Sequence, residues 1–186
     1  QRLPKQPCLI PISSVPPNSS THGYYQDKAA FAGRSMLPTK NGQKASDLVE
    51  KVKNAFPGLE TEEALKEHRN TVLDFISKDS AICAKEQEEI VGVLLFSKEN
   101  NVLCFLAVDP EHRRKHIAEK MVSYMLTKMN PQSDISVTTY REGVPEGIAA
   151  RAFYKRIGFS EGKLTEEFGS PVQEFVLKRQ SLSLEN

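Results

Sequence analysis

The sequence predicts a mixed α/β fold in which a central, mostly antiparallel sheet carries helices on both faces. Three short segments, 80–85, 90–97 and 101–108, are rich in β-branched and apolar residues and are separated by polar turns, which indicates an antiparallel meander. Helical periodicity flanks this meander, with two helices between 46 and 78 and another at 115–129. Elements of both kinds in one chain of 186 residues predict a single layered domain.

The two helices that precede the meander are delimited by local signals. The first begins at Ser46, and the pair Pro57-Gly58 ends it. Thr61 is placed to cap the second helix, because a threonine side chain accepts hydrogen bonds from N–H groups of the first turn. His68 lies on the apolar face of this second helix, where we expect a packed core histidine rather than a ligand.

Beyond the helix at 115–129 the strand pattern returns. Residues 135–140 form the next predicted strand, and residues 148–157 form the last predicted helix. Gly158 is expected to end that helix as a left-handed cap. Two more strands, at 159–163 and 172–177, complete the predicted sheet.

The N-terminal region is the least regular part of the chain. Residues 1–44 hold six of the eleven prolines and are predicted as a proline-rich arm, with a short edge strand at 8–12 and a short helix at 27–36. The folded domain is predicted to span 45–180, followed by a C-terminal tail at 181–186.

Composition argues against several classes of function. The chain has 25 Lys and Arg against 24 Asp and Glu, a net charge of +1, so nothing global favours nucleic acid or an anionic membrane as a partner. No apolar run reaches the roughly 18 residues that a membrane span requires, and no signal peptide is expected. The three cysteines, Cys8, Cys83 and Cys104, contain no C-x-x-C pair. We therefore expect buried thiols, a cytoplasmic protein and no metal site.

The junction between the strand at 101–108 and the helix at 115–129 carries the clearest functional signal. Pro110 stops further strand pairing, and a short polar loop leads directly into the helix. The first N–H groups of a helix lack intrahelical partners and lie at the positive end of its dipole, so they bind anions. Arg113, Arg114 and Lys115 add positive charge. A diphosphate is the expected ligand of this loop.

The four segments 89–96, 105–113, 113–118 and 149–159 follow one another in a characteristic order. Together they resemble the GNAT superfamily of N-acetyltransferases, in its bacterial type of unassigned substrate. EIVGVLLF at 89–96 is similar to that family's third strand, and FLAVDPEHR at 105–113 to its fourth strand and the following turn. RRKHIA at 113–118 resembles its Arg/Gln-x-x-Gly-x-Gly/Ala loop, and AARAFYKRIGF at 149–159 resembles its last helix and the start of the next strand. The resemblance spans about 48–177 and implies the GNAT fold, with acetyl-CoA as cosubstrate.

The resemblance also implies roles for individual residues. The loop would bind the pyrophosphate, and the backbone of the fourth strand would bind the pantetheine arm and the oxyanion. Tyr154 would protonate the departing thiolate; the alternative is an amphipathic tyrosine that closes the last helix onto the sheet. The residues predicted to bind the cofactor are Leu106, Ala107, Val108, Arg113, Arg114, Lys115, His116, Ile117, Ala118 and Arg151.

Three positions depart from the family pattern. His116 stands where the first loop glycine is expected, and it is accommodated if its φ stays negative. Gly147 stands where many members carry an asparagine that contacts the cofactor arm, a contact that Arg151 would replace. Val102 matches a position at which some members carry a glutamate that acts as general base.

No general base is therefore assigned. Glu99, Glu142 and Glu146 are the carboxylates near the predicted site, with solvated turn residues and a water relay as the alternatives. Arg141 and Glu142 follow the strand at 135–140, and they either face the acceptor or form an exposed turn.

The predicted function is transfer of an acetyl group from acetyl-CoA to a primary amine by direct attack in a ternary complex. The acceptor would be a small molecule or a peptide. An inert acyl-CoA-binding or sensing module on the same fold is the first alternative, because fold does not prove chemistry. Nucleic-acid contact through residues 112–116 is the second. Neither nucleic acid nor a membrane is an expected partner. The sequence leaves open whether the protein forms a homodimer.

Overall fold

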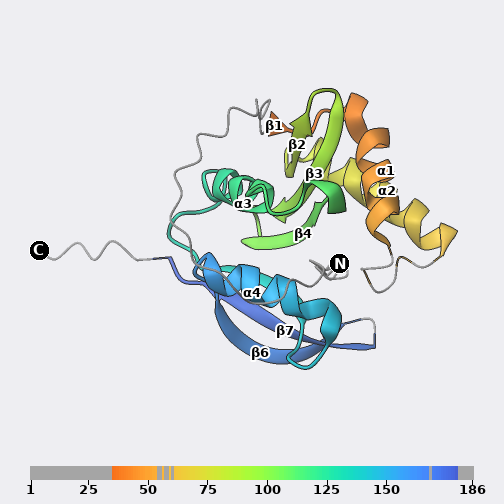
Figure 1. The fold of residues 1–186 in the computed structure, drawn as a ribbon. Helices are drawn as coiled ribbons and strands as arrows, with labels where there is room; N and C mark the ends of the chain where they lie inside the picture. Colours follow the sequence, from red (N-terminus) through yellow and green to blue (C-terminus); the bar gives the residue numbers. More distant parts are fainter. Residues whose placement is uncertain (1–34, 54–55, 57–58, 60, 168, 180–186) are drawn as a thin grey trace, which may run out of the picture.

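The computed structural model describes residues 35–53, 56, 59, 61–167 and 169–179 of the 186-residue chain. Within these residues, seven strands form one sheet in the order β1-β2-β3-β4-β5-β7-β6 (Figure 1). Neighbouring strands pair antiparallel except β4 and β5, which are parallel. The predicted fold class, a mostly antiparallel sheet with flanking helices, is confirmed.

The strands are β1 (Ser35–Met36), β2 (Ala81–Glu86), β3 (Glu89–Ser97), β4 (Val102–Val108), β5 (Ile135–Tyr140), β6 (Ser160–Glu167) and β7 (Ser170–Leu177). The α-helices are α1 (Gly42–Val52), α2 (Glu62–Ser77), α3 (Ile117–Leu126) and α4 (Ile148–Arg156). Short 3₁₀ turns are η1 (Thr39–Asn41), η3 (Pro110–His112) and η4 (Pro145–Gly147).

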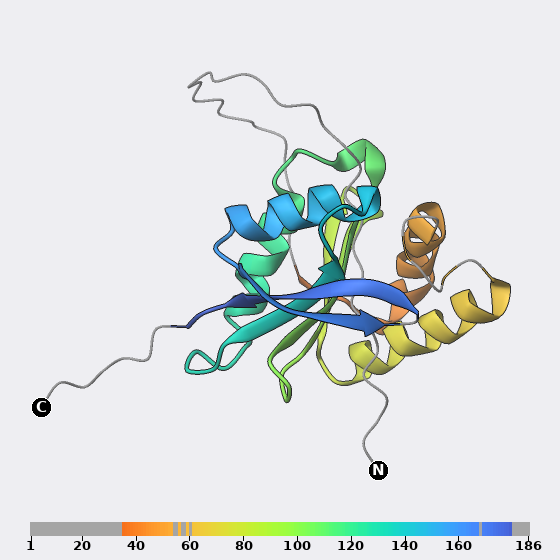
Figure 2. The same ribbon diagram turned by 90° about the horizontal axis from the view of Figure 1, so that it is seen from below.

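The sheet separates two hydrophobic cores. Helices α3 and α4 cover one face, and α1 and α2 cover the other (Figure 2). Successive side chains of a strand point to opposite faces, so the central strand β3 supplies both cores: Leu94 packs on the α3–α4 side, while Val93 and Leu95 pack on the α1–α2 side. The near-continuous apolar character of β3 follows from this double burial.

Most of the predicted elements are confirmed. Strands β2, β3 and β4 lie within one residue of their predicted bounds and form the expected meander. The Thr61 side chain accepts a hydrogen bond from the Ala64 N–H at 3.1 Å, as a helix cap. Gly158 ends α4 at a φ of +96°. Of the thiols in the described residues, Cys83 is buried and Cys104 half-buried, and neither is in a disulfide; Cys8 lies outside those residues.

Several boundaries were wrong. The helix predicted at 115–129 already ends at Leu126, and the strand predicted at 159–163 runs on to Glu167. Of the helix expected at 27–36, the described end is strand β1, because Ser35 and Met36 pair with β2; the rest lies outside the described residues, as does the strand expected at 8–12. Helix α1 begins at Gly42, inside the region predicted as an arm. Helix α3 begins only at Ile117, because the backbone at His116 is left-handed and cannot continue a right-handed helix.

Candidate active site

Strands β4 and β5 separate after a single point of contact. Their register contains one pair, Val102 with Ser136, at the start of both strands. Asn101 holds this end together. Its side-chain amide donates to the carbonyls of Ser133 at 2.7 Å and Asp134 at 3.1 Å, and its backbone carbonyl accepts from the Ser136 N–H. The sheet therefore opens as a V towards Val108. Asn101 was missed in the sequence, because its partners lie about thirty residues away.

The backbone of β4 turns some of its polar groups into this opening. The Asp109 N–H bonds to the Val91 carbonyl, so alternate residues of β4 bond to β3. By this alternation the N–H and carbonyl of Ala107 hydrogen-bond to β3. The N–H and carbonyl groups of Leu106 and Val108 point to the other side, towards β5. A register shift opposite Leu95 and Phe96 adds a β-bulge to β4, a feature that re-aims a strand. Two of the three predicted backbone contacts are thus available.

At the open end, buried Asp109 fastens the loop that leads into α3. Its carboxylate accepts from the Glu111 N–H at 2.9 Å and from Lys51 Nζ at 3.0 Å, and His112 Nδ1 lies 3.5 Å away. Burial raises the pKa of Asp109, but these hydrogen bonds outweigh it and hold the pKa below its ordinary value. The ionised carboxylate therefore joins the start of the loop to α1.

A second anchor comes from Glu86, the last residue of β2. Glu86 lies 2.6 Å from His112 Nε2 and 3.6 Å from Lys115 Nζ. Of the five basic residues at 112–116, two therefore share the same carboxylate oxygen. Arg113 is half-buried, and burial lowers the pKa of its guanidinium, while Arg114 is exposed.

The backbone at His116 does not meet the condition stated for a histidine in this loop. The φ of His116 is +56°, in the left-handed region rather than negative, and Arg114 has a φ of +64°. Each non-glycine residue in this region costs roughly 1 kcal/mol. Positive φ values on both sides of Lys115 curl consecutive N–H groups into the kind of concavity that binds anions.

We predict that His116→Gly stabilises the protein by about 0.5–1 kcal/mol, because relief of the left-handed backbone exceeds the entropy that glycine adds to the unfolded chain. Urea unfolding measures this. Lys115→Gly is the matched control: without a positive φ to relieve, it is expected to destabilise by a similar amount. Equal destabilisation by both substitutions would contradict the strain at His116.

The start of α3 packs closely on β3. A Cβ at Gly92 would lie 3.1 Å from Ile117 Cγ2 and 2.8 Å from Met121 Cε. Glycine at this position therefore lets the first turn of α3 settle on the sheet. The backbone N–H groups of this first turn of α3 therefore lie beside the open end of the V.

Tyr154 lies in the middle of α4 and is fully buried. Its ring contacts Phe153 and Phe159 with centroids 5.5 Å away, and Phe175 at 5.9 Å. It shares the α3–α4 core with Leu106 of β4. This packing closes α4 onto the sheet, which is the structural alternative given for Tyr154 in the sequence. The predicted role of Tyr154 in proton transfer stays a prediction.

Gly147 is explained by its neighbour Tyr140. A Cβ at Gly147 would lie 2.6 Å from Tyr140 Cβ, closer than real contacts allow, so an asparagine does not fit there. Arg151 does not face the loop at 113–118. Its guanidinium donates to Gln173 at 2.7 Å and the Tyr140 carbonyl at 3.3 Å, and pairs with Glu161. The predicted cofactor contact would require Arg151 to leave these partners.

The candidate bases lie at opposite ends of the V. Glu99 is in the β3–β4 turn, next to the closed end at Val102. Glu142 and Glu146 follow β5 at the open end, and both are exposed, as is Arg141. Position therefore favours Glu142 and Glu146 over Glu99 as residues near the loop.

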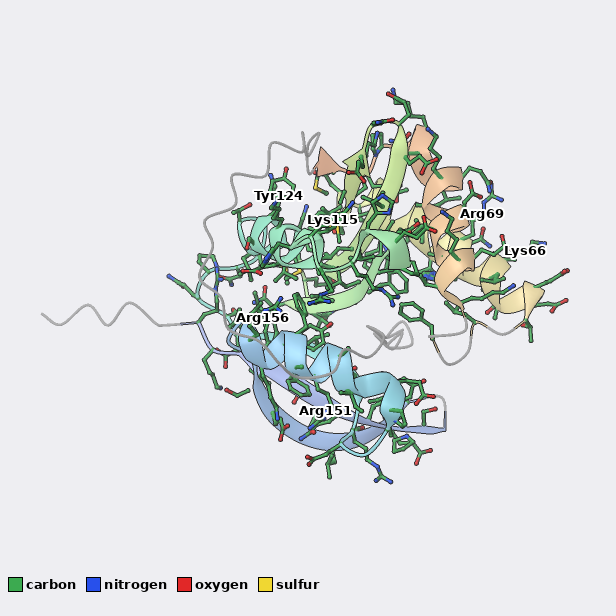
Figure 3. The ribbon with its side chains drawn as sticks, viewed as in Figure 1. Lys66, Arg69, Lys115, Tyr124, Arg151 and Arg156 are labelled. Atoms are coloured by element: carbon green, nitrogen blue, oxygen red, sulfur yellow. The ribbon has the colours of Figure 1, made fainter. Side chains whose placement is uncertain are left out.

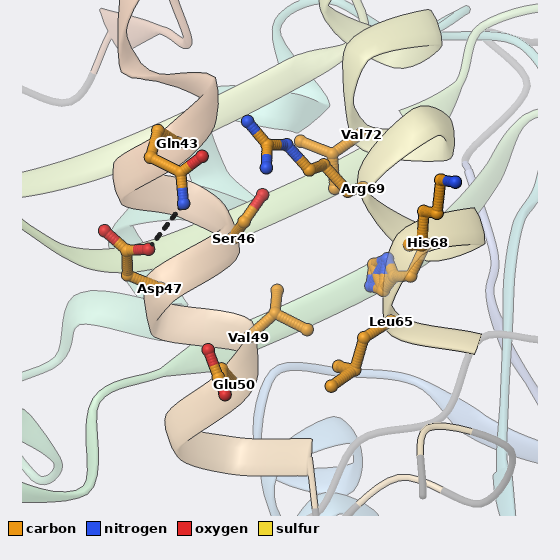
Figure 4. Close-up of a pocket in the computed structure, with 10 residues that line it drawn as sticks. Gln43, Ser46, Asp47, Val49, Glu50, Leu65, His68, Arg69 and Val72 are labelled. Atoms are coloured by element: carbon orange, nitrogen blue, oxygen red, sulfur yellow. Dashed lines mark hydrogen bonds between the residues drawn. The ribbon is translucent and has the colours of Figure 1, made fainter. Parts of the chain in front are cut away.

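A separate pocket of about 190 Å³ lies between α1 and α2 (Figure 4). Val49, Leu65 and His68 are among its lining residues. The His68 ring meets Phe105 of β4 edge-on at 4.8 Å, and Phe56 stacks on the same ring at 4.7 Å. The ring of His68 thus packs on the core as predicted, while its half-buried side chain also lines the pocket. Burial lowers its pKa to about 4, so it is neutral near pH 7.

His68 makes stability depend on pH. Its pKa is about 4 in the fold against an ordinary 6.5, so between these values the unfolded chain binds more protons. Stability is therefore expected to fall by up to about 3 kcal/mol as the pH drops from 6.5 to 4. Urea unfolding at several pH values measures this. His68→Gln should flatten the curve above pH 5, and an unchanged slope would contradict the assignment.

Comparison with known proteins agrees with this geometry. The family described as "Acetyltransferase (GNAT) family" matches residues 46–159, more than half of the chain. The chain belongs to this family of acetyltransferases. A comparison with curated proteins finds no significant match. In the described residues, no helix is long and apolar enough to cross a membrane.

Solved structures share the fold at low sequence identity. A GNAT-family acetyltransferase from Bacillus cereus ATCC 10987 superposes with a TM-score of 0.64 at 19% identity, over 80% of this chain and 98% of that one. PaiA N-acetyltransferase from Thermoplasma acidophilum, in complex with coenzyme A, gives 0.60 at 15%, over 76% and 96%. The ribosomal-protein-S18-alanine N-acetyltransferase from Escherichia coli gives 0.61 at 14%, over 83% and 97%.

Proposed function

We propose that this chain transfers an acetyl group from acetyl-CoA to a primary amine by direct attack in a ternary complex. The observation that supports this most strongly is the V between β4 and β5, with the loop at 113–116, which has left-handed backbone at Arg114 and His116, at its open end. A pyrophosphate on that loop would leave the pantetheine arm running along β4. The solved relative with coenzyme A bound makes this class of ligand reasonable.

The residues present fit such a ligand. Backbone N–H groups of residues 113–118, with Arg113 and Arg114, would hold the pyrophosphate. Backbone groups of Leu106 and Val108 would bind the pantetheine amides and the oxyanion. The cosubstrate supplies an activated acetyl thioester. Catalysis would rest on orientation, oxyanion stabilisation and proton transfer.

Proton transfer is assigned to one residue of the chain. The amine nitrogen attacks the thioester carbon, the carbon–sulfur bond breaks, and the sulfur leaves as a thiolate that needs a proton. Tyr154 would donate its hydroxyl proton to that sulfur. The amine must also lose a proton, for which Glu99, Glu142, Glu146 or water are the candidates.

The alternative functions make different demands. Contact with nucleic acid is disfavoured because Glu86 pairs with His112 and Lys115, and Glu119 pairs with His116 at 3.0 Å. Two observations favour the sensing alternative. Position 147 has no room for the asparagine that many family members carry, and Tyr154 is completely buried.

A panel of amines tests the proposal. Acetyl-CoA is incubated with polyamines, aminoglycosides, amino acids and peptides with free N-termini or lysines, and thiol release is measured with a chromogenic disulfide. Turnover that depends on one class of acceptor is expected. If acetyl-CoA binds in calorimetry but no amine is acetylated, the sensing function replaces the enzymatic one.

A further inference from the structure

Glu119 places a negative charge beside the loop that the proposed function assigns to a diphosphate. It lies in the first turn of α3, with its Oε2 atom 3.0 Å from His116 Nδ1. The same oxygen lies 3.7 Å from a guanidinium nitrogen of Arg156, which reaches over from α4 (Figure 3). One carboxylate oxygen is thus shared by two basic side chains from two elements.

The environment keeps this carboxylate ionised. The hydrogen bond with His116 holds the pKa of Glu119 below its ordinary value, and the charges of His116 and Arg156 act in the same direction. An acidic residue in a first turn also suits the helix dipole. Glu119 therefore stabilises the start of α3, but at the very position where a phosphate would bring further negative charge.

We propose that Glu119 is an internal counter-ion that sets the affinity of the cosubstrate site. In the unliganded protein it engages His116 and Arg156. A phosphoryl group of the cosubstrate then competes with it for these two side chains, and repulsion between the two anions weakens binding. This inference rests on the proposed function, because it requires a phosphorylated ligand at residues 113–118.

The proposal makes an unusual prediction. Glu119→Gln should bind acetyl-CoA about 3–10-fold more tightly than the natural chain in calorimetry at low salt, although it loses an ion pair and a favourable helix-dipole interaction and should unfold at a slightly lower temperature. The gain should shrink at 0.5 M salt, where surface charges are screened. Tighter binding by a less stable variant separates charge competition from general stabilisation.

Glu111→Gln is the matched control, because Glu111 is an exposed carboxylate of η3 on the same loop and its removal changes the net charge equally. Its acetyl-CoA affinity should change less than 2-fold. S-acetylpantetheine, which has no phosphate, should bind both variants and the natural chain alike. 3′-Dephospho-acetyl-CoA shows which phosphate competes: the gain persists if it is the pyrophosphate and disappears if it is the ribose phosphate.

Two results overturn the inference in distinguishable ways. If the natural chain binds acetyl-CoA and Glu119→Gln leaves the Kd unchanged or raises it, the role of Glu119 is wrong and the proposed function stands. If neither protein binds acetyl-CoA, the proposed function fails and the inference fails with it.

Discussion

Loss of the Arg151 guanidinium, as in Arg151→Met, is expected to destabilise the protein by about 3 kcal/mol. The side chain is almost fully buried and its guanidinium lies 5.1 Å from the Phe175 ring. Its removal leaves the side-chain carbonyl of Gln173, which is also buried, without the hydrogen bond from Arg151. Glu161 also loses one of its two cationic partners. A buried polar group without its partner carries most of this penalty. Urea unfolding measures it.

Arg156→Met is the matched control for Arg151. Arg156 is exposed, so its loss should change stability by less than about 1 kcal/mol. Equal effects of the two substitutions would contradict the structural role of Arg151. The acetyl-CoA affinity of Arg151→Met tests whether Arg151 also contacts the cofactor. A large loss of affinity in a folded variant would support that predicted contact.

Tyr154→Phe is expected to lower kcat by about 10²–10³-fold while changing the Kd of acetyl-CoA by less than 2-fold. Phenylalanine keeps the ring among Phe153, Phe159 and Phe175, so only the hydroxyl is removed. Loss of a general acid costs about this much in rate. Steady-state kinetics with the best acceptor, together with calorimetry, separates the effect on rate from the effect on binding.

Tyr124→Phe provides the comparison. Tyr124 lies on α3, where it is partly buried against the same core. Its loss should leave kcat within 2-fold. An unchanged kcat for Tyr154→Phe, with stability altered by about 1 kcal/mol, would leave Tyr154 as a core residue only.

Hydrophobic patterning was enough to predict most of the architecture. The runs that became β2, β3 and β4 alternate with polar turns, and the Thr61 cap and the Gly158 stop are local signals read within a few residues. The position of the loop between β4 and α3 was predictable for the same reason, because a strand, a proline and an amphipathic helix follow one another in the chain.

The remaining features depend on contacts between distant segments. The close approach of Gly147 to Tyr140 cannot be read from either residue alone. The same holds for the Lys51–Asp109 pair, which spans 58 residues, and for the partners of Arg151. The left-handed backbone at His116 also escaped prediction, because histidine does not signal that conformation as glycine does.

Amide hydrogen exchange with and without acetyl-CoA tests the binding site most directly. If the loop and the V hold the cosubstrate, exchange should slow at residues 113–118 and at Leu106 and Val108, while the pocket between α1 and α2 stays unchanged. Protection confined to residues 43–72, or none at saturating acetyl-CoA, would contradict the assignment of the cosubstrate to the β4–α3 junction.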